Sequence, residues 1–559
     1  MNLIVSLFVA LNAAAVPAQH VKRVVRLEDG STVIGTLYGN SKLCWLETAQ
    51  GEVLMQKEGS SAYVRTPLTR EEMMQRMAAA EESHGMKAPR RIGSQSTASL
   101  NSKGVCKIPV LLVSFADKDF SVADTDEGVR EYYDLFCNGT RDGNLYKGHG
   151  SYGAIRDYFV TQSDSIFLPD FVVIGPVKLD KNYAYYGKNN GTSLDVNYTE
   201  FRKEAVGKAV DQFDVDWLGL FDNRGKSQVD MLFIIYAGMG EANGGDENTI
   251  WPKDVNSSVT INNIRFDSFA CCNELRPNEV DDDNNIISTQ GDGVGIMCHE
   301  LSHALGLPDF YDTRGAAFGM DIWSVMDYGE YCVNGYCPVS YTAYERDFMG
   351  WRPLQTITEA GSYELLPTEA GGIGYKVVNP QNASEYYVLE NRQSVRWDRG
   401  IGSYGSGMQV THVDYNASSW NSNLVNVDAK RQRMTIIAAN NRYEGSSAEA
   451  SFDDMVITWS GNLFPYEQND SLTDNSIPAA TVYTSAGFMG QPIYDIRKVN
   501  SDGNIRFNFL KKIGTGMAMQ PKGRLRKDEV TYDLSGRRAA EQQRNGIYIQ
   551  NGRKRIGRK

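Results

Sequence analysis

The stretch His299–Tyr311, HELSHALGLPDFY, determines most of what this sequence predicts. If it begins as a helix, His299 and His303 lie on one face, while Glu300 points about 100° away from them. Two imidazoles at this spacing are typical zinc ligands, and a carboxylate beside them can take a proton from a water molecule that the metal activates. The pattern therefore predicts a catalytic zinc site for peptide hydrolysis, with Glu300 as general base.

The residues that follow supply the rest of the predicted site. Gly306, with a proline two residues later, ends the helix and lets the chain return, so that Asp309 can become the third ligand. Asp312, in the same irregular stretch, is an alternative ligand. Met326, in SVMDYG, is expected to pack beneath the metal. Tyr328 is expected to stabilise the tetrahedral oxyanion, with a buried core tyrosine as the alternative.

Much of the chain resembles one family. HELSHALGLPDFYD and DIWSVMDYG are similar to the zinc motif and Met-turn of the immune inhibitor A family of secreted metallopeptidases, in the metzincin clan. Segments such as IPVLLVSFAD, GSYGAIRDYF, IWP and YYVLENRQ carry the resemblance over roughly residues 105–510. The resemblance implies a zinc endopeptidase made as a zymogen. One catalytic Zn²⁺ would be held by His299, His303 and Asp309, with Glu300 as the base.

Composition and charge narrow the class of protein. With 559 residues, 41% hydrophobic and 23% charged, the chain is a globular protein of several domains. Residues 511–559 hold 14 Lys and Arg against 4 Asp and Glu, and the remainder holds 43 against 65. So acidic a body argues against nucleic acid as the main partner. Protein or peptide substrates are the partners that the zinc motif predicts.

The N-terminus predicts export. Residues 2–19 lack charged side chains, and an apolar run ends in Val16-Pro17-Ala18, a small-residue cleavage pattern. A signal peptide is predicted, although no Lys or Arg precedes the apolar run. A membrane anchor is the alternative, for which the run is short. No other segment could span a bilayer, so the mature form is expected to have no stable transmembrane segment. Eight cysteines in an exported protein permit disulfides without fixing any pairing.

Periodicity divides the remaining chain into modules. Buried strands alternate with amphipathic helices up to residue 352, which predicts an α/β metzincin-like catalytic domain with a mainly parallel twisted sheet. Only strand-like runs follow, so an all-β sandwich-type domain is expected there. A small β-rich propeptide, with a helix capped by Thr69 and Glu72, and a small β tail complete the fold. The predicted modules are a signal peptide (1–18), a propeptide and linker (19–103), the zinc metallopeptidase catalytic domain (104–352), the β-sandwich-type domain (353–510), a linker (511–527) and a C-terminal sorting domain (528–559).

Two further predicted sites rest on less specific sequence patterns. Asp281, Asp282 and Asp283 in EVDDDNN could bind Ca²⁺ through carboxylate oxygens, although adjacent carboxylates are more often a solvated turn. Cys44 could occupy the fourth zinc position as a thiolate and keep the zymogen inactive, although a core or disulfide cysteine is commoner. An aspartate or a loop could have the same effect.

The tail resembles the C-terminal sorting domain of type IX secretion substrates, in YDLSGRR and GIYIQNGRK. The resemblance implies contact with the secretion machinery, and a protein secreted by, or attached to the outer surface of, a Gram-negative bacterium. A basic tail that binds nucleic acid or anionic membrane is the alternative.

The predicted function is that of a secreted zinc-dependent endopeptidase. A catalytically weak surface-binding or scaffold protein that retains a zinc site is the main alternative, and a peptidase restricted to chain ends is another. Glu300 and Tyr328 are both present, which favours the enzyme.

Overall fold

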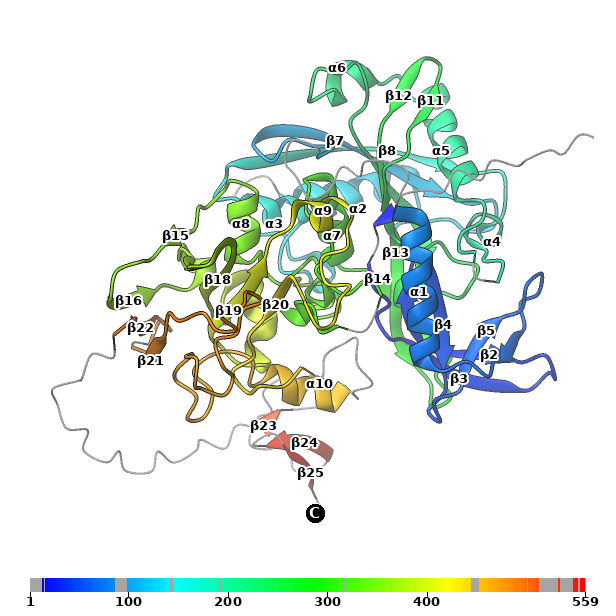
Figure 1. Cartoon of the computed structure of the whole chain (residues 1–559). Helices are drawn as coiled ribbons and strands as arrows, with labels where there is room; N and C mark the ends of the chain where they lie inside the picture. The colour runs from blue at the N-terminus through cyan, green and yellow to red at the C-terminus, as the bar shows by residue number, and fades with distance from the viewer. Residues whose placement is uncertain are drawn as a thin grey trace, which may run out of the picture.

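The computed structural model of the chain is shown in Figure 1. It describes residues 13–14, 16–85, 98–140, 144–191, 193–314, 317–443, 452–499, 501–511, 531–532, 546–550 and 553–557. Most of the predicted signal peptide and of both predicted linkers lies outside these residues. Among the described residues, no helix is both long and apolar enough to cross a membrane. All eight cysteines are free thiols.

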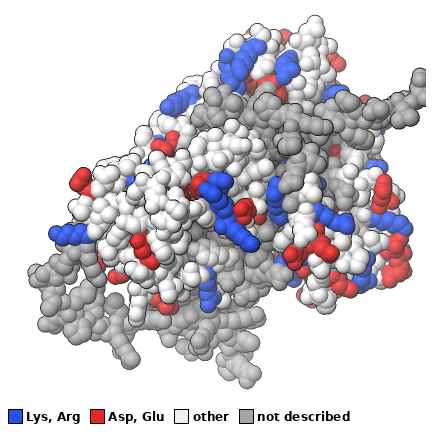
Figure 2. All heavy atoms as spheres, in the orientation of Figure 1, with Lys and Arg blue, Asp and Glu red and all other residues white. Residues whose placement is uncertain are grey.

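Residues 16–85, here called the leading unit, form an antiparallel sheet and one helix. The α1 helix, Arg70–Gly85, begins at the predicted cap, where the Thr69 N–H donates to Glu72 Oε2 (2.7 Å) and the Glu72 N–H donates to Thr69 Oγ1 (3.2 Å). Met73 and Met77, one turn apart, pack on the sheet. On the side of the leading unit that Figure 2 shows, acidic and basic side chains are interspersed. The strands of this sheet, in spatial order, are β2 (Lys22–Arg26), β3 (Thr32–Asn40), β4 (Leu43–Glu47), β5 (Val53–Gln56) and β6 (Tyr63–Arg65).

The central sheet is mixed. Four neighbouring strands, in the order β13-β9-β7-β8, are parallel, whereas β10, β14 and the short β1 pair antiparallel at the β13 edge. β14 forms a hairpin with the second half of β13, and β10 pairs antiparallel with its first residues; the predicted alternation of strands and helices included neither pairing. The strands are β1 (Ala13–Ala14), β7 (Gly104–Ser114), β8 (Phe167–Lys178), β9 (Leu232–Met239), β10 (Lys253–Val255), β13 (Phe269–Val280) and β14 (Ile286–Gly291).

Helices cover both faces of this sheet. Phe233 and Ile235 of β9 belong to a core with α2, α3 and α7, while Ile234 and Tyr236 belong to a second core with α4, α5 and α6. The alternation follows from the two-residue period of a strand, and continuous apolar runs are what a sheet buried on both faces requires. The helices are α2 (Asp126–Asn138), α3 (Ile155–Gln162), α4 (Tyr183–Gly187), α5 (Tyr198–Gln212), α6 (Trp217–Phe221), α7 (Gly295–Ala304) and α8 (Ala343–Phe348). A hairpin of β11 (Val259–Ile261) and β12 (Ile264–Phe266) lies beside α5.

Two further sheets follow residue 352 and share one hydrophobic core. The region is not all-β as predicted, because it contains α9 (Ala417–Asn421) and α10 (Phe452–Trp459). These helices are too short for a helical period to stand out in the sequence. The five-stranded sheet contains β15 (Gln355–Thr356), β17 (Tyr375–Asn379), β18 (Asn382–Arg392), β19 (Gly407–Asp414) and β20 (Met434–Ile436); the three-stranded sheet contains β16 (Gly361–Leu365), β22 (Ile505–Phe509) and β21 (Ile493–Lys498).

The region after residue 352 is joined to the central domain by a common core. Trp397, Trp420 and Trp459 belong to the same cluster of buried residues as the α7 side chains. At the C-terminus, β23 (Thr531–Tyr532), β24 (Gly546–Gln550) and β25 (Arg553–Gly557) form a small antiparallel sheet. The other residues of the predicted sorting domain lie outside the described part.

Candidate metal centre

The α7 helix presents two buried imidazoles to one point. The Nε2 atoms of His299 and His303 are 3.1 Å apart. The other ring nitrogens are held by backbone carbonyls: His299 Nδ1 lies 2.8 Å from the Val325 oxygen, and His303 Nδ1 lies 2.8 Å from the Leu307 oxygen. A carbonyl can only accept, so each Nδ1 carries the proton and each Nε2 directs a lone pair inward.

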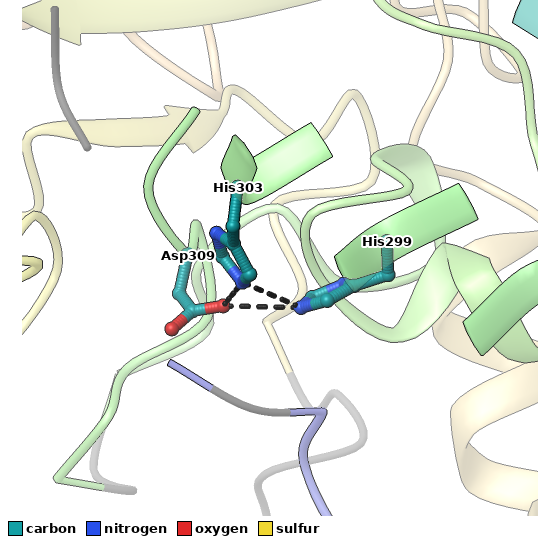
Figure 3. Close-up of side chains that lie close together, drawn as sticks. All are labelled: His299, His303 and Asp309. Atoms are coloured by element: carbon teal, nitrogen blue, oxygen red, sulfur yellow. Dashed lines mark hydrogen bonds and ion pairs between the residues drawn. The ribbon is translucent and has the colours of Figure 1, made fainter. Parts of the chain in front are cut away.

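Asp309 completes the group. Gly306 has a φ of 105°, a conformation that favours glycine, and it turns the chain at the end of α7. Asp309 Oδ1 then lies 3.2 Å from both Nε2 atoms, and Figure 3 shows the three side chains converging. Asp312 does not join them: its carboxylate accepts hydrogen bonds from the backbone N–H groups of Arg314 and Ala317, each 2.8 Å long.

The three atoms fit a tetrahedral metal ion. Donor atoms at normal zinc distances, about 2.0–2.1 Å, are separated by about 3.3 Å in tetrahedral geometry, close to the 3.1–3.2 Å found here. Three inward lone pairs repel one another unless a proton or a cation lies between them. Two imidazoles and a carboxylate suit zinc and leave a fourth position open. In the described part of the chain, no other group of three His, Cys, Asp or Glu side chains places its donor atoms so close together.

The predicted calcium residues do not form such a group. Asp281, Asp282 and Asp283 are exposed at the turn between β13 and β14. Asp281 Oδ1 accepts hydrogen bonds from the backbone N–H groups of Asp283 (2.9 Å) and Asn285 (2.8 Å), as in an ordinary Asx turn.

Burial and charge oppose each other in the cluster. Burial by itself lowers the pKa of His303, but the Asp309 carboxylate outweighs it and raises this pKa to about 9. Burial favours a neutral Asp309, yet the charge of His303 and the nearby imidazole of His299 hold the pKa of Asp309 below its ordinary value. A divalent cation held by these three side chains would compete with protons for the same lone pairs.

Glu300 lies on α7 beside the cluster and is completely buried. Burial raises the pKa of its carboxyl well above the ordinary value. Its Oε1 accepts a hydrogen bond from the backbone N–H of Val16 (3.2 Å). Its Oε2 has no hydrogen-bond partner among the described residues.

The N-terminal residues 13–14 and 16–20, here called the leading segment, lie across the site. Ala13 and Ala14 pair antiparallel with Val255 and Asp254 of β10, at one end of the central sheet. Beyond Glu300, the Val16 carbonyl accepts a hydrogen bond from the indole N–H of Trp251 (3.0 Å). The segment thus extends to both sides of Glu300.

Two tyrosines hold the leading segment further along. The hydroxyl of Tyr328, the predicted oxyanion donor, donates to the Gln19 carbonyl (3.1 Å). Tyr331 donates to the Pro17 carbonyl (2.7 Å). The sequence analysis did not identify Tyr331 or Trp251. Tyr331 could have been identified from its position one helical turn after Tyr328. Nothing local in the segment IWP indicates a role for Trp251.

The turn that contains Met326 contacts the segments that carry Asp309 and His299. The Met326 side chain is completely buried, and its carbonyl accepts a hydrogen bond from the Phe310 N–H (2.8 Å), next to Asp309. The preceding carbonyl, of Val325, orients His299. Glu330, which the sequence analysis also missed, places its Oε2 3.7 Å from His299 Nδ1. Burial raises the pKa of Glu330 well above its ordinary value.

One family model matches the region that carries the site. Residues 95–352 match the model described as the immune inhibitor A peptidase M6 catalytic domain. This region contains every residue of the metal cluster and is therefore similar to the catalytic domain of a family of metalloproteases.

Two kinds of curated relative share this similarity. The pre-pro-metalloprotease PrtV of Vibrio cholerae serotype O1 is 25% identical over 286 residues, which cover 45% of this chain and 30% of the relative. Immune inhibitor A of Bacillus thuringiensis subsp. alesti is 26% identical over 271 residues, which cover 43% of this chain and 39% of the relative. The chain thus spans 30–39% of the length of these relatives.

Proposed function

We propose that this protein is a zinc-dependent endopeptidase that hydrolyses peptide bonds in proteins. His299, His303 and Asp309 would hold one catalytic Zn²⁺. Two observations support this proposal: residues 95–352 match a metalloprotease family model, and the three donor atoms fit a tetrahedral ion.

Zinc, when bound, would polarise the scissile carbonyl and lower the pKa of the attacking water. Glu300 would take the proton of that water and pass it to the leaving nitrogen. The second step is supported by the 3.2 Å hydrogen bond from the backbone nitrogen of Val16 to Oε1, which shows that a peptide nitrogen can reach this carboxylate. Burial raises the pKa of Glu300 and so helps it to retain the proton between the steps. Tyr328 would donate to the oxyanion once its hydroxyl is free of Gln19.

The leading segment is the observation that favours an endopeptidase. A peptidase restricted to chain ends needs a cleft that is closed on one side of the reacting bond. Here a chain lies on both sides of Glu300, paired with β10 on one side and bonded to Trp251 and Tyr331 on the other. The scaffold alternative does not account for a carboxylate placed beside both the metal ligands and a peptide nitrogen.

Casein digestion followed by mass spectrometry of the products tests this function. We expect internal fragments, loss of cleavage with a chelator, and recovery with added zinc. Glu300→Ala should abolish cleavage while retaining one bound zinc. Release of single amino acids alone would show a chain-end peptidase, and full activity of Glu300→Ala would refute the mechanism.

The leading unit is proposed to be the propeptide that keeps the enzyme latent. It covers the site through the leading segment. A buried polar contact, in which Arg23 of β2 places Nη1 3.4 Å from Glu241 Oε1, joins it to the catalytic domain. Asn189 donates to both oxygens of Glu241 (3.0 Å each) and holds it in place. The Cys44 thiol faces Glu241 at 3.7 Å and not the metal cluster, so the covering chain and not a thiolate would block the site.

Cleavage after Ala18, which the sequence predicts, would remove Val16 and Pro17 from the cleft but leave Gln19 and the Arg23–Glu241 contact. N-terminal sequencing and intact mass of the secreted protein distinguish these forms. An enzyme that keeps residues 19–103 and is fully active would contradict latency.

The finer assignments complete the proposal. We propose that residues 353–510 are a sandwich-type domain, which the core shared by its two sheets supports. The predicted boundaries, the sorting role of residues 528–559 in type IX secretion, and release or attachment at the outer surface of a Gram-negative cell remain proposals based on sequence resemblance. Intact mass of the exported protein would also reveal whether the tail is removed.

A further inference from the structure

One residue from the region after residue 352 makes a two-point contact with the proposed third zinc ligand. The Asp309 backbone N–H donates to Asn423 Oδ1 (2.7 Å), and Asn423 Nδ2 donates to Asp309 Oδ2. Both residues are 1% exposed. One amide therefore binds the backbone and the side chain of Asp309 together, across 114 positions of sequence.

This contact separates the roles of the two carboxylate oxygens. Oδ2 accepts the amide of Asn423, while Oδ1 faces the Nε2 atoms of both histidines at 3.2 Å. Rotation of the carboxylate about its Cβ–Cγ bond would break the contact with Asn423. The amide thus holds Asp309 in the orientation in which a single oxygen faces the metal position.

The segment that carries Asn423 is itself held firmly. The Asn416 side chain caps α9 by accepting a hydrogen bond from the Ser419 N–H (3.0 Å). Trp420 is completely buried between Phe310 and Tyr344, with ring centroids 6.4 Å away in each case. Asn423 then adopts a φ of 57°, a left-handed conformation that asparagine tolerates better than most residues.

A second asparagine anchors the next turn of the same segment. Asn426 Nδ2 donates to the carbonyls of Phe310 and Met434, both at 2.6 Å. Its Oδ1 accepts from the N–H groups of Arg433 and Met434, both at 2.9 Å. The loop around Asp309 is therefore attached to β20 through side-chain amides, and the position of Asn423 is set by the sheet behind it.

We propose that Asn423 is a positioning residue for the metal site, so that the region after residue 352 completes the catalytic centre. The inference rests on the proposed zinc-binding function of His299, His303 and Asp309. Partners of this kind orient a metal ligand, and their loss commonly weakens metal affinity about 10- to 100-fold.

Zinc titration of the full chain against a competing chromophoric chelator tests the inference. All variants carry Glu300→Ala, so that neither self-cleavage nor catalysis affects the result. Asn423→Ala removes the amide, whereas Asn423→Asp keeps the size of the side chain but replaces the donor with an oxygen that would face Asp309 Oδ2. Asn421→Ala is the matched control, because Asn421 is an exposed asparagine in the same segment.

We expect the Kd for zinc to rise about 10- to 100-fold in Asn423→Ala, and at least as much in Asn423→Asp. Asn421→Ala should stay within about twofold of the parent. Circular dichroism of the metal-free proteins shows whether the variants are folded. A role in packing alone would leave zinc affinity intact in the isosteric Asn423→Asp, and that result would overturn the inference. If the parent itself bound no zinc, the proposed function would fail, and this inference with it.

Discussion

The contact between Arg23 and Glu241 gives the most quantitative prediction, through the variant Arg23→Met. Both side chains are buried, at 7% and 1% exposure, and they join the leading unit to the catalytic domain. Burial raises the pKa of Glu241 to about 7, against the opposing effect of the Arg23 charge. Methionine retains much of the arginine volume but removes both the charge and the hydrogen bonds.

The loss of docking free energy in Arg23→Met, where docking means the contact of the leading unit with the catalytic domain, depends on pH. Glu241 is an acid with a raised pKa, so the stability that its neutral form gives the docked unit is present below its ordinary value of 4.5 and is lost as the pH rises through about 7. Without Arg23 its pKa rises further, and each pH unit above 7 costs the docked variant up to about 1.4 kcal/mol more than the parent. Lost hydrogen bonds add about 1 kcal/mol at any pH. The equilibrium constant for release of the leading unit from the catalytic domain, here called undocking, should therefore increase roughly fivefold at pH 6 and roughly 50-fold at pH 8.

Amide hydrogen exchange of residues 16–26, in a Glu300→Ala background, measures this undocking. Lys57→Met is the control, because Lys57 and Glu28 form an ion pair within the leading unit in which both side chains are about half exposed (54% and 48%). An increase of the same size at pH 6 and pH 8 would refute the electrostatic reasoning. An equal increase in exchange in Lys57→Met would also refute it.

Three further variants test other parts of the molecule. Glu300→Ala should lower kcat/KM on a peptide substrate by about 10²–10⁴-fold with zinc content unchanged, since general base catalysis contributes about that much; a loss of zinc would instead indicate a role in metal binding. Burial lowers the pKa of His20 to about 4, so the docked unit should lose stability as the pH falls from 6.5 towards 4, and His20→Phe should remove this acid-side loss of protection in hydrogen exchange. Trp420→Ala should destabilise the protein by about 3–5 kcal/mol, visible in chemical denaturation; a change below about 1 kcal/mol would contradict the close packing around it.

The sequence alone was sufficient wherever a local period or cap determined the structure. The spacing of His299 and His303 places both imidazoles on one face of α7, and Thr69 and Glu72 form the predicted cap of α1. The buried strands expected before residue 352 are present, and the apolar run VDMLFIIYAG contains β9, which is buried on both faces. These features depend on interactions over a few residues, which the order of residues states directly.

Only the tertiary structure decided the features that depend on distant parts of the chain. The sequence favoured Asp309 as a ligand but left Asp312 as an alternative. In the structure, Asp309 lies beside both imidazoles and Asn423, whereas nearby backbone N–H groups bind Asp312. In the same way, the antiparallel edge of the central sheet and the position of Val16 beside Glu300 depend on segments that are far apart in sequence. No local pattern encodes such contacts, because their geometry depends on how the whole chain packs.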